Sequence, residues 1–118
     1  MAEKKSQKLE VIFAKNDQSG KEPVREWLKN LSKNDKKILG EDIMAVQYGW
    51  PIGMPLVRNL GNGLWEVRTS LENRIARVIF FVRNNKIVLL HGFIKKTQQT
   101  PKEDIELALT RKTTFLTK

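Results

Sequence analysis

The side chains best suited to chemistry are cations within one strand-like stretch, residues 64–96. Several arginines lie inside or at the ends of the expected strands. Solubilising charges normally lie in loops or on helix faces, so arginines in strands favour a surface that binds a polyanion. The basic residues of this stretch and its flanks are Arg58, Arg68, Arg74, Arg77, Arg83, Lys86, Lys95 and Lys96.

A cationic surface of this kind can bind RNA phosphates and can also help to cleave RNA. The 2′-hydroxyl supplies the nucleophile, so the protein needs cations around the phosphate, a base and an acid. Neighbouring positive charges disfavour the charged form of a lysine. A lysine of this cluster is therefore a candidate general base.

The residues that other kinds of functional site require are missing from the sequence. No glycine-rich loop leads from a strand into a helix, and no two carboxylates share a strand face. The chain has no cysteine and one histidine, His91. A disulfide framework or a zinc site is therefore not expected, and we predict neither a metal nor another cofactor.

The aromatic residues and His91 have two interpretations each. Strand alternation places His91 on the core face, so a histidine satisfied by a backbone group is favoured over a general base. Trp65 and Phe80 are expected in the core for the same reason, and Trp27 is expected there because it lies on the apolar stripe of a predicted helix. Phe81 lies on the cationic face and is the better candidate for stacking on a base, the alternative being that it packs against the C-terminal helix.

Size and charge limit the protein class. The 118 residues are expected to form one domain, 1–118, with flexible ends at 1–7 and 114–118. Net charge is +9, and residues 56–99 contain eight Lys or Arg against Glu66 and Glu72. No apolar run approaches a membrane span, and the first residues do not resemble a signal peptide. We expect a cytoplasmic protein with no membrane partner.

Three consecutive strands, 64–69, 74–83 and 86–94, must position the cations. Asn84-Asn85 favours a tight hairpin, because asparagine tolerates positive φ. The resulting register places Phe80 opposite Leu89 and Arg77 opposite Gly92. A four-residue loop at 70–73 would place Arg68 opposite Ile75 and Glu66 opposite Arg77.

The remaining elements are read from caps and periodicity. A strand is expected at 8–14, a helix from Pro23, and a second helix after Ser32 that ends at Gly49. Thr100 is the predicted N-cap of a last helix. The predicted fold class is α+β in the order β-α-α-β-β-β-α. Its antiparallel sheet has a helical hairpin on one face and an open basic face on the other.

Several segments resemble a known family. LWEVR at 64–68, IARVIFF at 75–81 and LHGFIKKT at 90–97, followed by Thr100-Pro101, resemble HigB-type toxins, the phage-derived branch of the RelE/ParE toxin superfamily. The resemblance implies a RelE-like fold and a type II toxin that cleaves mRNA on the translating ribosome. It also implies a helix-turn-helix antitoxin partner, through which alone the toxin would reach operator DNA.

The resemblance also implies roles for particular residues. Arg77 and Arg68 correspond to the active face, and Lys95 and Lys96 lie beside the cleaved phosphate. RelE relatives use a tyrosine near the C-terminal helix, whereas residues 98–108 contain none; Lys96 or Lys95 is therefore our predicted base, with Asp104 a weaker candidate. Further RNA or ribosome contacts are predicted at Arg58, Arg74, Arg83, Lys86 and Phe81.

Two alternatives share the fold and stay open. A ParE-like protein would poison DNA gyrase without cleaving RNA, and a catalytically silent phage relative would bind only its antitoxin or RNA. Fold alone does not separate these functions. Retention of Arg77 and the two lysines favours the ribonuclease.

Overall fold

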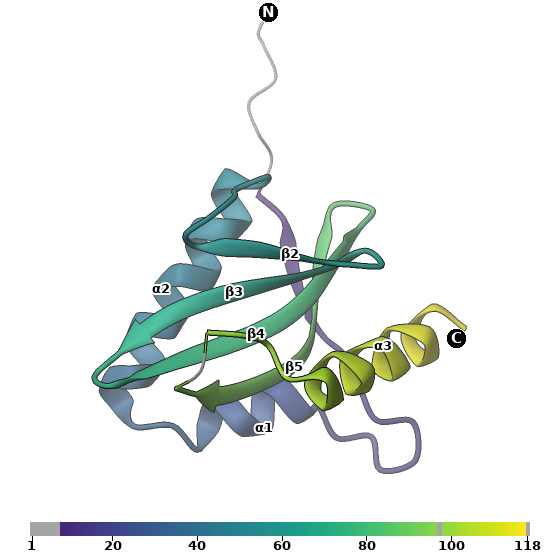
Figure 1. The fold of residues 1–118 in the computed structure, drawn as a ribbon. Coiled ribbons are helices and arrows are strands. Elements are labelled where there is room, and N and C mark those ends of the chain that lie inside the picture. The colour runs from purple at the N-terminus through teal and green to yellow at the C-terminus, as the bar shows by residue number, and fades with distance from the viewer. Residues whose placement is uncertain (1–7, 97, 118) are drawn as a thin grey trace, which may run out of the picture.

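A computed structural model describes residues 8–96 and 98–117 and shows an α+β fold in three layers. The strands are β1 (Glu10–Phe13), β2 (Val57–Gly61), β3 (Leu64–Leu71), β4 (Arg74–Arg83) and β5 (Lys86–Lys95). The helices are α1 (Pro23–Lys29), α2 (Lys33–Gly49) and α3 (Lys102–Leu116). Figure 1 shows α1 and α2 behind the sheet and α3 in front of it. None of the described helices is long and apolar enough to cross a membrane.

The strands form one mixed sheet in the order β1-β5-β4-β3-β2. β2 to β5 are antiparallel neighbours, but β1 pairs with β5 in parallel. The prediction of a wholly antiparallel sheet was therefore wrong at β1. The two helices between β1 and β2 form the crossover that a parallel pairing requires.

One face of the sheet packs against α1 and α2, as predicted. Val67, Val78 and Phe80 are fully buried there against Val24, Leu39 and Val46 of the helices. Each such side chain contributes roughly 1.5–3 kcal/mol by its burial. The Ser32 side chain caps α2 by accepting a hydrogen bond from the backbone N–H of Asp35, also as predicted.

The second face is not open, because α3 covers part of it. Ala108 and Phe115 of α3 pack against sheet residues such as Ile79, Phe81 and Leu90. Phe115 belongs to the tail that was predicted to be flexible, yet α3 continues to Leu116. The corresponding prediction for residues 1–7 lies outside the described part of the chain.

The β3–β4 connection is tighter than predicted. β3 continues to Leu71 and β4 begins at Arg74, which leaves two loop residues, and Asn73 adopts a φ of +59°. Arg68 therefore pairs with Arg77 rather than with Ile75, and Glu66 pairs with Ile79 rather than with Arg77. The Asn84-Asn85 turn has positive φ at both residues, as predicted.

A β-bulge in β5 changes which residues share a face. Phe80 pairs with Leu89 as predicted, but Ile79 pairs with His91, so Leu90 is an extra residue. Arg77 consequently lies opposite Phe93 rather than Gly92. The bulge places the side chains of His91 and Phe93 on the α3 face, so the prediction of His91 on the core face was wrong. It places Ile94 on the opposite face, where Ile94 packs against the α1–α2 core.

Candidate functional site

Three arginines from three adjacent strands lie together on the α3 face, which we call the arginine cluster: Arg58 of β2, Arg68 of β3 and Arg77 of β4. Strand pairing sets their neighbourhood, since Arg58 is opposite Glu66 and Arg68 is opposite Arg77. Like charges directly opposite each other in a sheet are unfavourable. Because the arrangement does not favour stability, we take this position as the candidate functional site.

Arg77 is fully buried on the face opposite the helical hairpin. Its three guanidinium nitrogens lack a hydrogen-bond partner among the described residues. Its guanidinium carbon lies 5.9 Å from the ring centre of Phe93. Burial lowers the pKa of Arg77, the charges of Arg68 and Arg58 lower it further, and the Glu66 carboxylate opposes the shift. The geometry leaves a buried cation with unused donors.

Glu66 is the buried carboxylate of this cluster. Its Oε2 accepts a hydrogen bond of 2.8 Å from the Thr100 hydroxyl, and its Oε1 lies 3.5 Å from Nε of Arg68. Thr100 was predicted to cap α3, but the N-cap residue is Pro101. The Thr100 side chain instead ties the start of α3 to β3.

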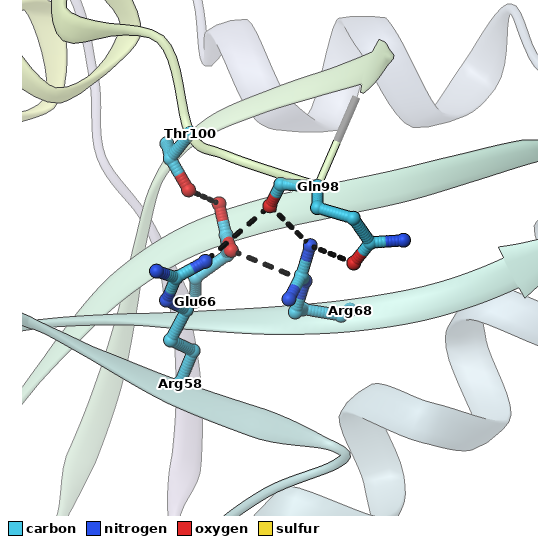
Figure 2. Close-up of polar contacts among 5 residues, drawn as sticks. All are labelled: Arg58, Glu66, Arg68, Gln98 and Thr100. Atoms are coloured by element: carbon cyan, nitrogen blue, oxygen red, sulfur yellow. Dashed lines mark hydrogen bonds and ion pairs between the residues drawn. The ribbon is translucent and has the colours of Figure 1, made fainter. Parts of the chain in front are cut away.

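A backbone oxygen also contacts the arginine cluster. The Gln98 carbonyl accepts hydrogen bonds from Nη2 of Arg68 at 2.6 Å and from Nη1 of Arg58 at 3.3 Å. Figure 2 shows this oxygen between the two guanidinium groups, with Thr100 and Glu66 beside it. A hollow of about 220 Å³ adjoins Arg68 and Gln98 and is otherwise lined by Met54, Pro55, Ser70 and Ile75.

His91 connects β5 to α3 at the edge of the cluster. Its Nε2 lies 2.6 Å from Oδ1 of Asp104, and its Nδ1 lies 3.5 Å from Nη1 of Arg111. Burial lowers the pKa of His91, although the hydrogen bond to Asp104 opposes the shift. A neutral ring with its proton on Nε2 fits both contacts. Because both nitrogens face protein groups, His91 and Asp104 serve to hold α3 on the sheet.

The two candidate lysines lie at the end of β5. Lys95 pairs with Ile75 in register and, by alternation from Phe93, shares the face of Arg77. Lys96 follows at a bend, just beyond the strand. Both side chains are exposed. The structure thus places Lys95 on the face of Arg77, two residues along β5 from the Phe93 that pairs with Arg77, and Lys96 next to it in sequence.

The other predicted binding residues lie outside the cluster. Arg74 donates a hydrogen bond of 3.0 Å to Asp35 and anchors the start of α2. Arg83 and Lys86 flank the β4–β5 turn, six residues or about 20 Å along β4 from Arg77. Phe81 is buried against Phe115, so the prediction of an exposed stacking platform was wrong: α3 covers it.

Sequence reasoning missed the role of the oxygen atoms that contact these cations. It placed Glu66 opposite Arg77 but gave the carboxylate no role, and the structure pairs Glu66 with Arg58 and Ile79 instead. Gln98 contacts Arg68 chiefly through its backbone carbonyl at 2.6 Å, which no residue type indicates, and its side-chain Oε1 accepts a longer hydrogen bond of 3.4 Å from the same nitrogen. Within residues 8–96 and 98–117, no three His, Asp or Glu side chains gather closely enough to hold a metal ion.

Comparison with known proteins gives one result at the level of family. A sequence model of the phage-derived Gp49-like proteins (DUF891) matches residues 26–113, from α1 through most of α3. No curated protein matches the chain. The match includes all three arginines of the cluster, as well as Glu66 and Thr100. The chain belongs to the Gp49-like family of phage-derived proteins.

Proposed function

We propose that the chain is the toxin of a type II toxin–antitoxin pair, an endoribonuclease that cleaves translated mRNA on the ribosome. The Gp49-like family is associated with RelE- and HigB-type toxins, which supports the toxin class. A net charge of +9 suits a partner made of RNA. A helix-turn-helix antitoxin would be its neutralising partner.

The observation that carries the proposal is the arginine cluster with its unused donors. A ribonuclease that uses the 2′-hydroxyl must stabilise a phosphate whose negative charge increases in the transition state. Arg58, Arg68 and Arg77 lie on one face of three adjacent paired strands, and the buried Arg77 has three guanidinium nitrogens without a hydrogen-bond partner among the described residues. Guanidinium groups match phosphate oxygens in geometry and charge.

Lys95 is our candidate for the base in this scheme. It is exposed on the face of Arg77, at the strand end where an RNA backbone could approach the cluster. In the proposed reaction a lysine, Lys95 or Lys96, removes the proton of the 2′-hydroxyl. The 2′-oxygen then attacks the phosphorus, the bond to the 5′-oxygen breaks, and a 2′,3′-cyclic phosphate forms. The leaving 5′-oxygen takes up a proton as this bond breaks.

A reconstituted translation system tests this function. Purified protein should cut an mRNA that is being translated, and primer extension should map the cuts within the reading frame. The same mRNA without ribosomes should stay intact. A DNA gyrase supercoiling assay run in parallel reports the alternative activity. Inhibited gyrase with uncut mRNA would contradict the proposal, as would no effect in either assay.

A further inference from the structure

The Gln98 carbonyl occupies a position suited to an anion. It is an uncharged peptide oxygen, yet it accepts hydrogen bonds from two guanidinium groups, at 2.6 Å from Arg68 and 3.3 Å from Arg58 (Figure 2). Two arginines on one oxygen is an arrangement typical of bound phosphate or carboxylate. The segment 98–100 therefore fills a site whose charge favours a negative ligand.

A second contact holds the same segment. The Thr100 hydroxyl donates to Oε2 of Glu66 at 2.8 Å, and Thr100 is buried whereas Gln98 is exposed. The side-chain Oε1 of Gln98 also accepts a hydrogen bond of 3.4 Å from Nη2 of Arg68. The segment is thus fixed to β3 through the backbone and side-chain oxygens of Gln98 at one end and the Thr100 hydroxyl at the other.

The carbonyl satisfies the site only in part. A carbonyl oxygen has two lone pairs, and Arg58 and Arg68 use both. Arg77 is left buried with three nitrogens that lack a partner among the described residues. A phosphate group has more acceptor oxygens than a carbonyl and carries a full negative charge. It can therefore accept more hydrogen bonds from Arg58 and Arg68 than the carbonyl does, and it offsets the positive charge of the cluster, which the neutral carbonyl does not.

We infer that segment 98–100 is an internal occupant of the phosphate site, with the Gln98 carbonyl oxygen in the place of a phosphate oxygen, and that it moves aside when a phosphodiester binds. The free protein is then held in a self-blocked state. The inference rests on the proposed function only in taking RNA as the natural source of the phosphodiester.

The carbonyl carbon of Gln98 gives a direct readout. Hydrogen bonds to a carbonyl oxygen shift its ¹³C resonance downfield, so loss of both bonds shifts it upfield. The probe is a 2′-O-methyl trinucleotide, which carries phosphodiesters but has no 2′-hydroxyl to attack them. Titrated into ¹³C,¹⁵N-labelled protein, it should bind saturably and move the Gln98 resonance upfield in step with binding. The variant Arg68→Gln should lose most of that affinity.

Variants at position 100 test whether the segment competes with the probe. Thr100→Val removes the hydroxyl that holds the segment closed and should bind the trinucleotide about tenfold more tightly, the factor expected from one charge-assisted hydrogen bond. Thr100→Ser keeps the hydroxyl and should bind as the original protein does. Thr113→Val, at an exposed position of α3, is the matched control and should also leave the affinity unchanged.

Three results would overturn the inference: an unmoved Gln98 resonance at saturation, no tighter binding by folded Thr100→Val, or no binding at all. The resonance test needs no variant, so it stands if Thr100→Val fails to fold. Displacement of Gln98 by a probe in a protein that cuts no mRNA would keep the inference and refute the proposed ribonuclease. Cleavage of translated mRNA by a protein whose Gln98 resonance does not move on probe binding would refute the inference and keep the proposed ribonuclease.

Discussion

At the scale of single residues, the arginine cluster combines features that reduce stability. Arg68 and Arg77 are paired across neighbouring strands, and the Arg77 guanidinium is buried without a hydrogen bond from the described residues. A buried charge costs several kcal/mol unless opposing charges and hydrogen bonds offset it. Residues that reduce stability in this way are expected at positions that function requires.

Glu66 is predicted to offset the charge of Arg77, and a double-mutant cycle measures this. Glu66→Gln should lower the free energy of unfolding by about 3 kcal/mol, because it removes the carboxylate that most strongly opposes the lowered pKa of Arg77. Adding Arg77→Met removes the cation and should recover much of the loss, with a coupling of about 1–3 kcal/mol. Urea denaturation gives all four values; strictly additive effects would show that the two residues do not interact.

His91 gives a prediction about pH. Burial lowers the pKa of His91 below its ordinary value of 6.5, so the folded protein binds this proton less readily than the unfolded chain. The His91 contribution to stability should therefore be present above pH 6.5 and be lost as the pH falls below it. Urea denaturation at pH 7.5 and 5.0 should show a smaller acid loss in His91→Gln. No other histidine is present, so an equal loss in both proteins would refute the assignment.

The sequence predicted the cations of the site better than their partners. Arg68 and Arg77 were recognised because arginine is unusual within strands, and both lie in the cluster. The acceptor from Gln98 was not predictable, because a backbone oxygen carries no residue-type signal and its position depends on the path between β5 and α3.

At the scale of elements, turns and caps were predicted where the residue type decides the backbone. Asn84-Asn85 and Ser32 act locally, and both predictions were confirmed. The β5 bulge was missed because no residue near Leu90 indicates it, and it exchanges the faces of His91, Phe93 and Ile94. The tight β3–β4 turn did have a signal in the sequence: Asn73 tolerates the positive φ of such a turn, and the prediction of a four-residue loop did not use it.

Two glycines should respond in opposite ways to the same substitution. A Cβ at Gly92 of β5 would lie 2.4 Å from the Trp27 ring, whereas a Cβ at Gly40 of α2 meets nothing within 4 Å. Gly92→Ala should therefore destabilise the fold by about 1–3 kcal/mol through the displaced ring. Gly40→Ala should stabilise it by roughly 0.5–1 kcal/mol through helix propensity. Thermal unfolding checks both, and a neutral Gly92→Ala would contradict the close packing of α1 on β5.

At the scale of the whole molecule, the sheet separates two cores, and the functional candidates lie on the α3 side. The sequence predicted an open basic face because α3 has an ordinary apolar stripe that does not specify which face it covers. α3 covers the middle of that face, which buries Phe81 and confines the exposed cations to its margins. The basic residues thus lie in several places: the arginine cluster, Lys95 and Lys96 at the end of β5, Arg74 beside Asp35, and a remote pair, Arg83 and Lys86.

The remote pair should affect binding and not the chemical step. Arg83→Ala and Lys86→Ala should weaken ribosome association and reduce its dependence on salt concentration, because each removes one phosphate contact. The rate of mRNA cleavage at saturating protein should stay unchanged, since both residues are distant from Arg77. Co-sedimentation with ribosomes over a salt series measures the first effect. A lower saturated rate would place these residues in the reaction itself.

The most direct test of the central claim compares two arginine substitutions in the cleavage of translated mRNA. Arg77→Met keeps much of the side-chain volume without the charge and should slow cleavage by about 10²–10³-fold, the cost of removing one group that stabilises the transition state. Arg25→Ala, on α1 beside Glu22, is the matched control and should cleave as the original protein does. A folded Arg77→Met protein that cleaves at the original rate would contradict the account.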